Sequence, residues 1–155
     1  MILHISKPDA EDYNELTEIC LKSIKHWGYP NFLIEIWKEE LTITPRYIRN
    51  HDLLKIENEH GEILGFGSMK KDHLKDFYEI DHFWVLPEYI EGNAGKLLLE
   101  NLEKKVAPQK MIKVVSDPNT LLFYQNSGYL KVGETKSKPD GRSLPILKKI
   151  IDNQI

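Results

Sequence analysis

Cysteine is almost absent from the sequence, which has a single one, Cys20, among its 155 residues. No internal disulfide can form, and a zinc site built on several thiolates is excluded. The histidines do not replace those ligands, because no H-x-x-x-H spacing or dense carboxylate cluster surrounds His51, His60, His73 or His82. The sequence therefore predicts a protein without a metal, in a reducing compartment.

Long apolar runs and a strong charge of one sign are also missing. The apolar run at residues 1–5 is too short for a signal peptide, and no stretch approaches the roughly 18 apolar residues of a membrane-spanning helix. The formal net charge is only −3, without the concentrated basic surface that nucleic-acid binding requires. We therefore expect a cytoplasmic protein with neither a membrane nor a nucleic-acid partner.

The elements that the sequence does contain alternate between helical and strand patterns. Its length, with 41% hydrophobic and 29% charged residues, is typical of one soluble domain. The predicted order is a strand at 2–6, helices starting at Asp9, Asn31 and Thr44-Pro45, strands at 53–57, 62–69 and 77–85, a helix after 91–95, a strand at 111–115, a helix from Asp117 to Gly128, and strands at 129–132 and 144–150. Residues 1–155 are thus predicted to form a single mixed α/β domain.

The most informative segment is a strand, a glycine-bearing loop and an amphipathic helix over residues 79–106. Free backbone N–H groups at the start of such a helix can bind phosphate oxygens. The loop is neither a Walker loop nor a G-x-G-x-x-G turn. On its own it is compatible with an anion site or with an ordinary turn.

The wider segment, residues 85–98, resembles the acetyl-CoA-binding segment of GNAT acetyltransferases. In that family a strand ending in V-x-P runs into (Q/R)-x-x-G-x-(G/A) and a leucine-rich helix, and the spacing here fits without a gap. Gly95 matches the second small position. Asn93 replaces the first Gly, and is the least costly replacement if a positive φ is needed there. Ile90 replaces Gln or Arg, which implies weaker binding of the phosphates.

A second segment, residues 115–129, resembles the other GNAT signature. There an Asn, here Asn119, opens a helix that carries a Phe-Tyr pair, here Phe123-Tyr124, and a Gly-aromatic step follows. The two segments in this order imply the α/β GNAT fold, with a mixed six- to seven-stranded sheet splayed between its fourth and fifth strands and helices on both faces. They imply an N-acetyltransferase that transfers an acetyl group from acetyl-CoA to a primary amine of a small molecule, peptide or protein by direct attack.

The resemblance also implies which residues bind the cofactor, acetyl-CoA, without a metal. Its phosphates would lie against the backbone of residues 90–95, and its pantetheine arm would enter between Val85 and the strand ending at residue 115. The implied contacts are Val85, Ile90, Glu91, Gly92, Asn93, Ala94, Gly95, Lys96, Asn119 and Tyr124. Lys96 could equally be a solvated lysine, and Asn119 a helix N-cap.

Catalysis needs a group that stabilises the leaving thiolate and a base that deprotonates the attacking amine. Tyr124 is the predicted thiolate partner, since a hydroxyl can stabilise or protonate a thiol whose pKa is about 8.5. Glu79 is the first candidate base, because it resembles the carboxylate that many relatives carry on this strand, and His82 is the second, because of its suitable pKa. Side-chain alternation predicts Glu79 and Asp81 on one face of the strand and His82 on the other.

Two other functions remain open from the sequence. The departures at Ile90 and Asn93 are compatible with a catalytically idle GNAT-fold module that binds coenzyme A as a sensor or has lost it. A structural subunit that forms a homodimer through its last strands is the other alternative. The choice of acceptor amine would depend on the loops around residues 28–50 and 135–145.

Overall fold

The computed structural model describes residues 1–72, 74–139 and 141–152. His73, weighed above as a metal ligand, and residue 140, in a loop expected to shape the acceptor site, lie outside these ranges. The helices are α1 (Tyr13–His26), α2 (Asn31–Leu41), α3 (Pro45–Asn50), α4 (Ala94–Glu103) and α5 (Leu121–Asn126). Short 3₁₀ helices lie at Ala10–Asp12, Pro87–Tyr89 and Pro118–Thr120. Their order along the chain is the predicted one.

The described strands form one seven-stranded sheet, with the spatial order β1-β2-β3-β4-β5-β7-β6. The strands are β1 (His4–Ser6), β2 (Asp52–Glu57), β3 (Ile63–Asp72), β4 (Phe77–Val85), β5 (Met111–Val115), β6 (Leu130–Ser137) and β7 (Arg142–Ile150). Neighbours β4 and β5 are parallel, and the other described pairs are antiparallel. The predicted mixed sheet is confirmed.

Helix ends follow the local signals in the sequence. Thr44 Oγ1 accepts a hydrogen bond from the Tyr47 N–H at 3.0 Å, and Pro45 follows as the first helical residue of α3. Gly28, with φ of 82°, comes two residues after the end of α1, a conformation that glycine adopts at little cost. These two signals determine where α1 ends and where α3 begins, in the helical segment that packs on one face of the sheet.

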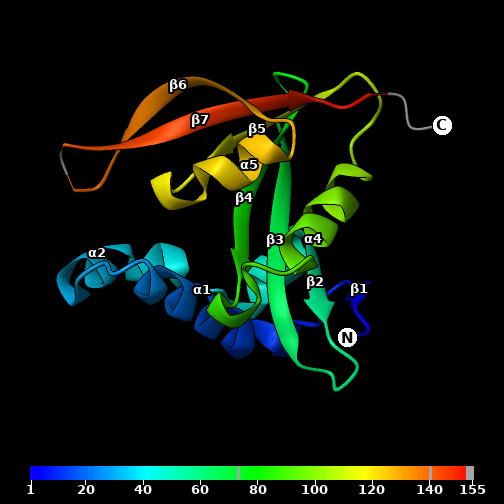
Figure 1. Ribbon diagram of the computed structural model, residues 1–155, viewed down its shortest axis with the longest axis vertical. Coiled ribbons are helices and arrows are strands. Elements are labelled where there is room, and N and C mark those ends of the chain that lie inside the picture. Colours follow the sequence, from blue (N-terminus) through cyan, green and yellow to red (C-terminus); the bar gives the residue numbers. More distant parts are fainter. Residues whose placement is uncertain (73, 140, 153–155) are drawn as a thin grey trace.

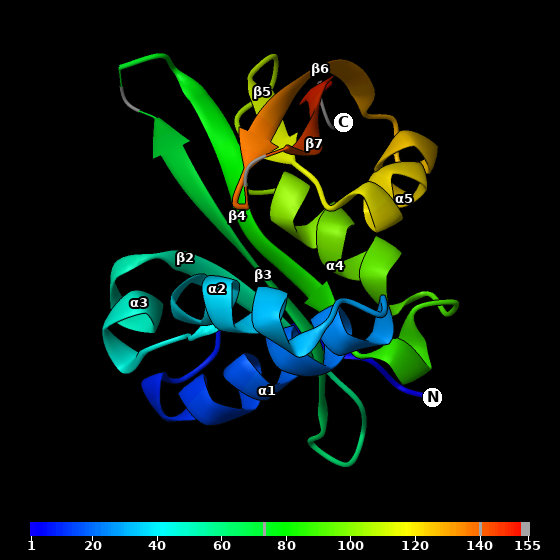
Figure 2. The same ribbon diagram turned by 90° about the vertical axis from the view of Figure 1, so that its left-hand side faces the viewer.

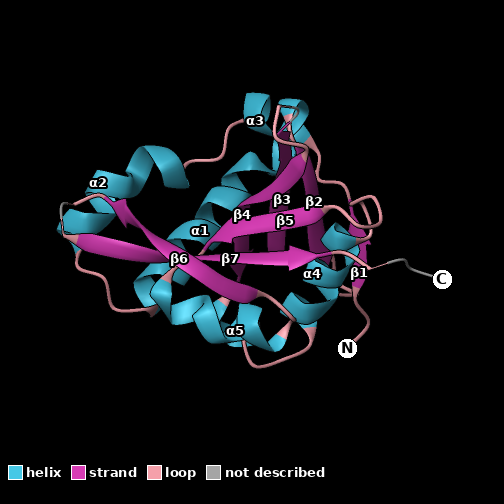
Figure 3. Ribbon diagram, turned by 90° about the horizontal axis from the view of Figure 1, so that it is seen from above, coloured by secondary structure: helices cyan, strands magenta, loops and turns pink. Residues whose placement is uncertain are grey.

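Helices cover both faces of the sheet, as predicted (Figure 3). Phe66 of β3 lies opposite Trp84 of β4, and both pack with α1, α2 and α3. On the other face, Met69 and Ile80 pack with Leu102 of α4 and Tyr124 of α5. In the described part of the chain, no helix is both long enough and apolar enough to cross a bilayer.

The sheet splays open between β4 and β5. Their pairing is limited to Tyr78–Ile80 against Ile112–Val114, so residues 81–85 have no strand partner on that side. In Figure 1, β6, β7 and α5 lie above this opening and α1 and α2 lie below it. The predicted splay is therefore confirmed, and it places unpaired backbone in the middle of the molecule.

Candidate active site

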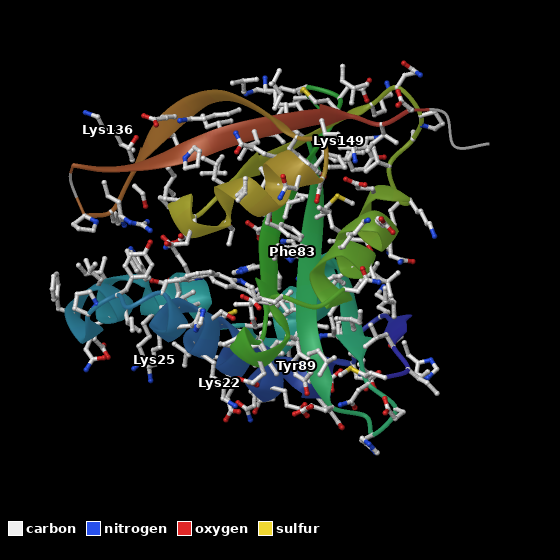
Figure 4. The ribbon with its side chains drawn as sticks, viewed as in Figure 1. Lys22, Lys25, Phe83, Tyr89, Lys136 and Lys149 are labelled. Carbon is white, nitrogen blue, oxygen red and sulfur yellow. The ribbon has the colours of Figure 1, made fainter. Side chains whose placement is uncertain are left out.

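A cavity of about 590 Å³ occupies the splay. Figure 2 shows the surrounding elements, with α1 and α2 below and α5, β6 and β7 above. Phe83 of β4, labelled in Figure 4, is one of the residues that line the cavity. Residues on both sides of the sheet line the cavity: Ile90, Gly95, Phe123 and Tyr124 near α4 and α5, and Trp27, Trp37, Glu39, Glu40 and Tyr47 from the α1–α3 segment. Two ligands can therefore reach one point from opposite faces.

A β-bulge in β4 changes which side chains face the cavity. Ser68 lies opposite His82, but the next residue of β3, Met69, lies opposite Ile80, so Asp81 is an extra residue. Beyond the bulge the alternation is shifted by one, and Glu79 and His82 share a face. The prediction that His82 lies on the face opposite Glu79 is therefore wrong.

Ser68 organises the bulge through a hydrogen-bond chain whose directions are fixed. Asp81, an ionised carboxylate, can only accept, so the Tyr47 hydroxyl donates to its Oδ2. Ser68 Oγ, 2.8 Å from Tyr47 Oη, must then donate to Tyr47. Its lone pair remains for the His82 N–H at 3.0 Å. The fully buried Ser68 hydroxyl thus holds His82 directly and Asp81 through Tyr47.

We predict that Ser68→Ala lowers the free energy of unfolding by about 1–3 kcal/mol, because it leaves the buried His82 N–H and the Tyr47 hydroxyl each short of a partner. Urea unfolding followed by circular dichroism measures the loss. Ser143→Ala is the matched control, since the Ser143 hydroxyl also bonds a side chain, Glu134, but at an exposed site. Equal stability of the two variants would contradict the role given to Ser68.

Electrostatics keep Asp81 charged. Burial alone would raise the pKa of this carboxyl group, but the hydrogen bond from Tyr47 and the electrostatic interactions with the neighbouring His82 and Lys70 outweigh it and hold the pKa below its ordinary value. The Lys70 ammonium lies 3.3 Å from Asp81 Oδ1. Asp81 is therefore an anion on the wall of the cavity.

His82 also lines the cavity, and its ring is fixed by a neighbour. The Trp84 indole N–H donates to His82 Nδ1 at 3.0 Å. Burial, the largest effect, lowers the pKa of His82, so the ring is neutral at pH 7. The two predicted bases differ in their access to the cavity. His82 lines it, whereas Glu79 is half-buried opposite Lys70 and Lys113 and does not.

Tyr124 lies where a ligand in the cavity can meet its hydroxyl. The residue is 4% exposed and lines the cavity. Among the described residues, every fully enclosed side-chain oxygen or nitrogen has a hydrogen-bond partner, but the Tyr124 hydroxyl has none, so it is not fully enclosed. The hydroxyl therefore opens on the cavity. Burial raises the pKa of this phenol far above its ordinary value, so it keeps its proton. Phe123 lines the cavity as well.

The loop before α4 has the free donors that its sequence suggested. Within the described chain, no acceptor bonds the backbone N–H groups of residues 93–96, and the first helical bond there runs from Leu97 N–H to the Asn93 carbonyl at 3.0 Å. Asn93 has φ of −90°, so no positive φ is needed, and the cost considered for replacing Gly at this position does not arise. Glu91, Gly92 and Asn93 are exposed, and Ala94 is buried.

Gly95, in contrast, is required by packing. A Cβ at this position would lie 3.3 Å from Phe123 Cε1 and 3.4 Å from Val85 Cγ2. Ile90 and Val85 line the cavity beside it. Lys96 is exposed and borders a smaller hollow, of about 170 Å³, between α4 and α5.

Asn119 is held by its neighbours on the cavity wall. Its side-chain N–H donates to Asp117 Oδ1 at 2.8 Å and to the Tyr29 hydroxyl at 3.2 Å. Asp117 is the N-cap of the 3₁₀ helix, accepting from the Asn119 N–H at 2.8 Å, so the N-cap interpretation of Asn119 is wrong. Arg142 of β7 donates to the Tyr29 hydroxyl at 3.0 Å and to Asp117 Oδ2 at 3.3 Å. This cluster joins the α1–α2 connection to β7 along one wall.

Sequence reasoning assigned no role to Tyr47, Ser68, Tyr29 or Arg142. Their partners are distant in the chain: Tyr47 precedes Asp81 by 34 residues, and Tyr29 precedes Arg142 by 113. No local pattern marks such pairs. In the described ranges, no group of three His, Cys, Asp or Glu side chains is placed to hold a metal ion.

Comparisons with known proteins agree with this geometry. A family model described as an acetyltransferase (GNAT) domain matches residues 16–146. No curated protein matches the sequence. Among solved structures, the PaiA N-acetyltransferase of Thermoplasma acidophilum in complex with coenzyme A has a TM-score of 0.74 and 21% identity, covering 97% of this chain and 99% of that one. The ribosomal-protein-S18-alanine N-acetyltransferase of Escherichia coli has a TM-score of 0.67 and 17% identity, covering 99% of this chain and 96% of that one.

Proposed function

Because the chain belongs to the GNAT acetyltransferase family, we propose that it is an acetyl-CoA-dependent N-acetyltransferase that acylates a primary amine by direct attack. One observation carries the proposal: a single cavity runs through the splayed sheet and is lined from both faces. A donor and an acceptor can therefore meet beside the Tyr124 hydroxyl without passing one another. The solved complex of the PaiA N-acetyltransferase, which has a similar fold, with coenzyme A adds support.

The residues on the α4 and α5 side fit the cofactor. Four free N–H groups, at residues 93–96, stand at the positive end of α4 and suit phosphate oxygens. Unpaired backbone at residues 81–85 suits the amides of a pantetheine arm, as a peptide adds to a sheet edge. Gly95 keeps the start of α4 close to Val85 and Phe123. Asn119 would reach the arm only with its side-chain oxygen, because its amide nitrogen is engaged.

The opposite side fits a cationic acceptor. Asp81, Glu39 and Glu40 line it together with the aromatic rings of Trp27, Trp37, Tyr47 and Trp84. Carboxylates attract an ammonium group, and aromatic faces favour it further. We assign to Asp81, through water, the removal of the first proton from the ammonium, because Glu79 does not line the cavity. The acceptor is thus an ammonium-bearing small molecule or peptide.

Tyr124 would act on the leaving group. Acetyl-CoA, when bound, supplies the thioester that the amine attacks. Because burial raises the pKa of Tyr124 above the roughly 8.5 of an ordinary thiol, the phenol stabilises the departing thiolate by donating a hydrogen bond rather than by complete proton transfer. The proton lost by the new amide nitrogen balances the one that the free thiol finally gains.

We predict that saturating acetyl-CoA raises the thermal midpoint of the purified chain by about 5–10 °C. Ligand at about 100 times its Kd adds roughly 2.7 kcal/mol, and about 2–4 °C per kcal/mol is usual for chains of this size. A thermal melt with and without the cofactor measures the shift. Thiol release from acetyl-CoA with a panel of cationic amines then measures transfer.

The two steps separate the proposed enzyme from its rivals. ATP, which has no pantetheine arm, serves as a control for unspecific binding of nucleotides. A shift without amine-dependent thiol release would indicate the coenzyme A-binding module instead of an enzyme. No shift at millimolar acetyl-CoA would contradict both and leave a structural role.

A further inference from the structure

The contact between Trp84 and His82 determines which nitrogen of the histidine carries the proton. An indole N–H can only donate. Since Trp84 Nε1 lies 3.0 Å from His82 Nδ1, Nδ1 must present its lone pair. A neutral imidazole with an unprotonated Nδ1 has its proton on Nε2.

The protonated nitrogen of His82 opens on the cavity. His82 lies in the stretch of β4 that has no partner on the β5 side, and its ring is one of the cavity walls. In the described part of the protein, every fully enclosed side-chain nitrogen or oxygen has a hydrogen-bond partner. His82 Nε2 has none there, so it is not fully enclosed. Nε2 therefore keeps access to open space. It offers the cavity one N–H donor and no acceptor.

We propose that Trp84 is a positioning residue that fixes His82 as the Nε2–H tautomer, so that His82 donates a hydrogen bond to the acyl oxygen and does not remove the proton of the amine. The proposal rests on the function proposed above. It replaces the sequence-based hypothesis that His82 is a base.

The surroundings of His82 oppose a base role. Protonation of Nδ1 would place two donors face to face, and the hydrogen bond from Trp84 would be lost. The charged and titratable groups around the ring act in both directions: Asp81 favours the imidazolium, while Lys70 and His51 disfavour it. The Tyr47 ring stands edge-on at 5.5 Å. Burial is the largest of these effects, and it favours the neutral ring.

A fixed donor fits the movement of charge in acyl transfer. As the nitrogen lone pair of the amine forms the new C–N bond, the acyl oxygen gains negative charge. As the C–S bond breaks, that charge leaves with the sulfur. The Nε2 proton of His82 stays on nitrogen throughout, because the donor only stabilises the oxygen. The protons of the amine leave through Asp81 and water, and Tyr124 serves the sulfur.

Nitrogen-15 NMR of the labelled full-length chain tests the tautomer without any acceptor. Two-bond correlations from the ring carbon protons distinguish protonated from unprotonated ring nitrogens. We expect His82 to show an unprotonated Nδ1 and a protonated Nε2 at pH 7, in one tautomer. A protonated Nδ1, or a mixture of tautomers, would overturn the proposal.

Removal of the indole N–H tests the role of Trp84. In Trp84→Phe the pKa of His82 should rise by about half to one pH unit, because protonation no longer breaks a hydrogen bond of ordinary strength. Trp37→Phe is the matched control: it removes another cavity indole N–H, one that donates to the Lys138 carbonyl at 2.9 Å, and should leave the His82 titration unchanged. An unchanged titration in Trp84→Phe would count against the proposal, and if that variant does not fold, the wild-type tautomer decides.

Titration with acetyl-CoA and with coenzyme A locates the acceptor of the His82 hydrogen bond. We expect the His82 Nε2–H resonance to move with acetyl-CoA and to move less with coenzyme A, which has no acyl oxygen. Equal movement with both would contradict donation to that oxygen. If neither ligand moved any resonance of the protein, the proposed function would fail, while the tautomer result would stand separately.

Discussion

Replacement of Tyr124 by Phe should lower kcat by about 10²–10³-fold, the usual loss when one preorganised donor to a developing charge is removed. The affinity for acetyl-CoA should stay within about twofold. The reason is that the Tyr124 hydroxyl opens on the cavity without a protein partner, so its removal leaves no orphaned group and creates little new space. Thiol release with the best amine of the panel gives kcat, and calorimetric titration gives the affinity.

Tyr129→Phe is the matched control. Its ring lies 5.5 Å from that of Tyr124, and it is also buried, but its hydroxyl donates to Glu103 Oε2 at 2.8 Å and does not face the cavity. This variant should lose stability and keep its kcat. Equal turnover of wild type and Tyr124→Phe would remove Tyr124 from the mechanism, and equal losses in the two variants would indicate a packing effect.

Much of the fold could be predicted because its signals are local. Thr44 followed by Pro45 marks the start of α3 within two residues. The strands at 77–85 and 111–115 have the predicted bounds, since a strand stopped by Pro87 and a short apolar run are both visible in the sequence. The splay followed from the family resemblance, and the limited pairing of β4 with β5 confirms it.

The geometry of β4 could not be predicted, because it depends on another strand. Ser68 precedes His82 by 14 residues, and its hydroxyl bonds the backbone of the bulge from the neighbouring strand. A single extra residue, Asp81, then reverses the faces of everything beyond it. The family resemblance named Glu79 as the first candidate base, and alternation placed it on one face with Asp81. In the structure Asp81 lines the cavity and Glu79 does not.

In the loop before α4, too, some features could be predicted from the sequence and others could not. Its free N–H groups follow from the position of a loop at a helix start, which the sequence displays. The requirement for a glycine at residue 95 could not be predicted locally, because it comes from the close approach of Phe123, which is distant in the sequence. Asn93 needed no special backbone conformation. Of the two departures from the family pattern, only Ile90 therefore remains as a cause of weak cofactor binding.

That reasoning leads to a second large expected effect, a gain. Ile90→Arg should tighten the binding of acetyl-CoA by about 10–100-fold, because a charge-assisted hydrogen bond to a phosphate contributes about 1.5–3 kcal/mol. Ile90 is half-buried on the cavity wall and ends the 3₁₀ helix at Pro87–Tyr89, so the longer side chain can reach toward the free N–H groups without entering the core. Calorimetric titration at low and high salt measures the gain.

Two variants separate a phosphate contact from a general effect of charge. Ile36→Arg adds the same charge on α2, at a residue that is 46% exposed and does not line the cavity, and should leave the affinity unchanged. Ile90→Gln, which supplies a neutral donor, should give a smaller gain. The gain of Ile90→Arg should shrink as salt screens the pair. An equal gain in Ile36→Arg would reveal unspecific attraction, and no gain in Ile90→Arg would mean that the phosphates do not lie against this loop.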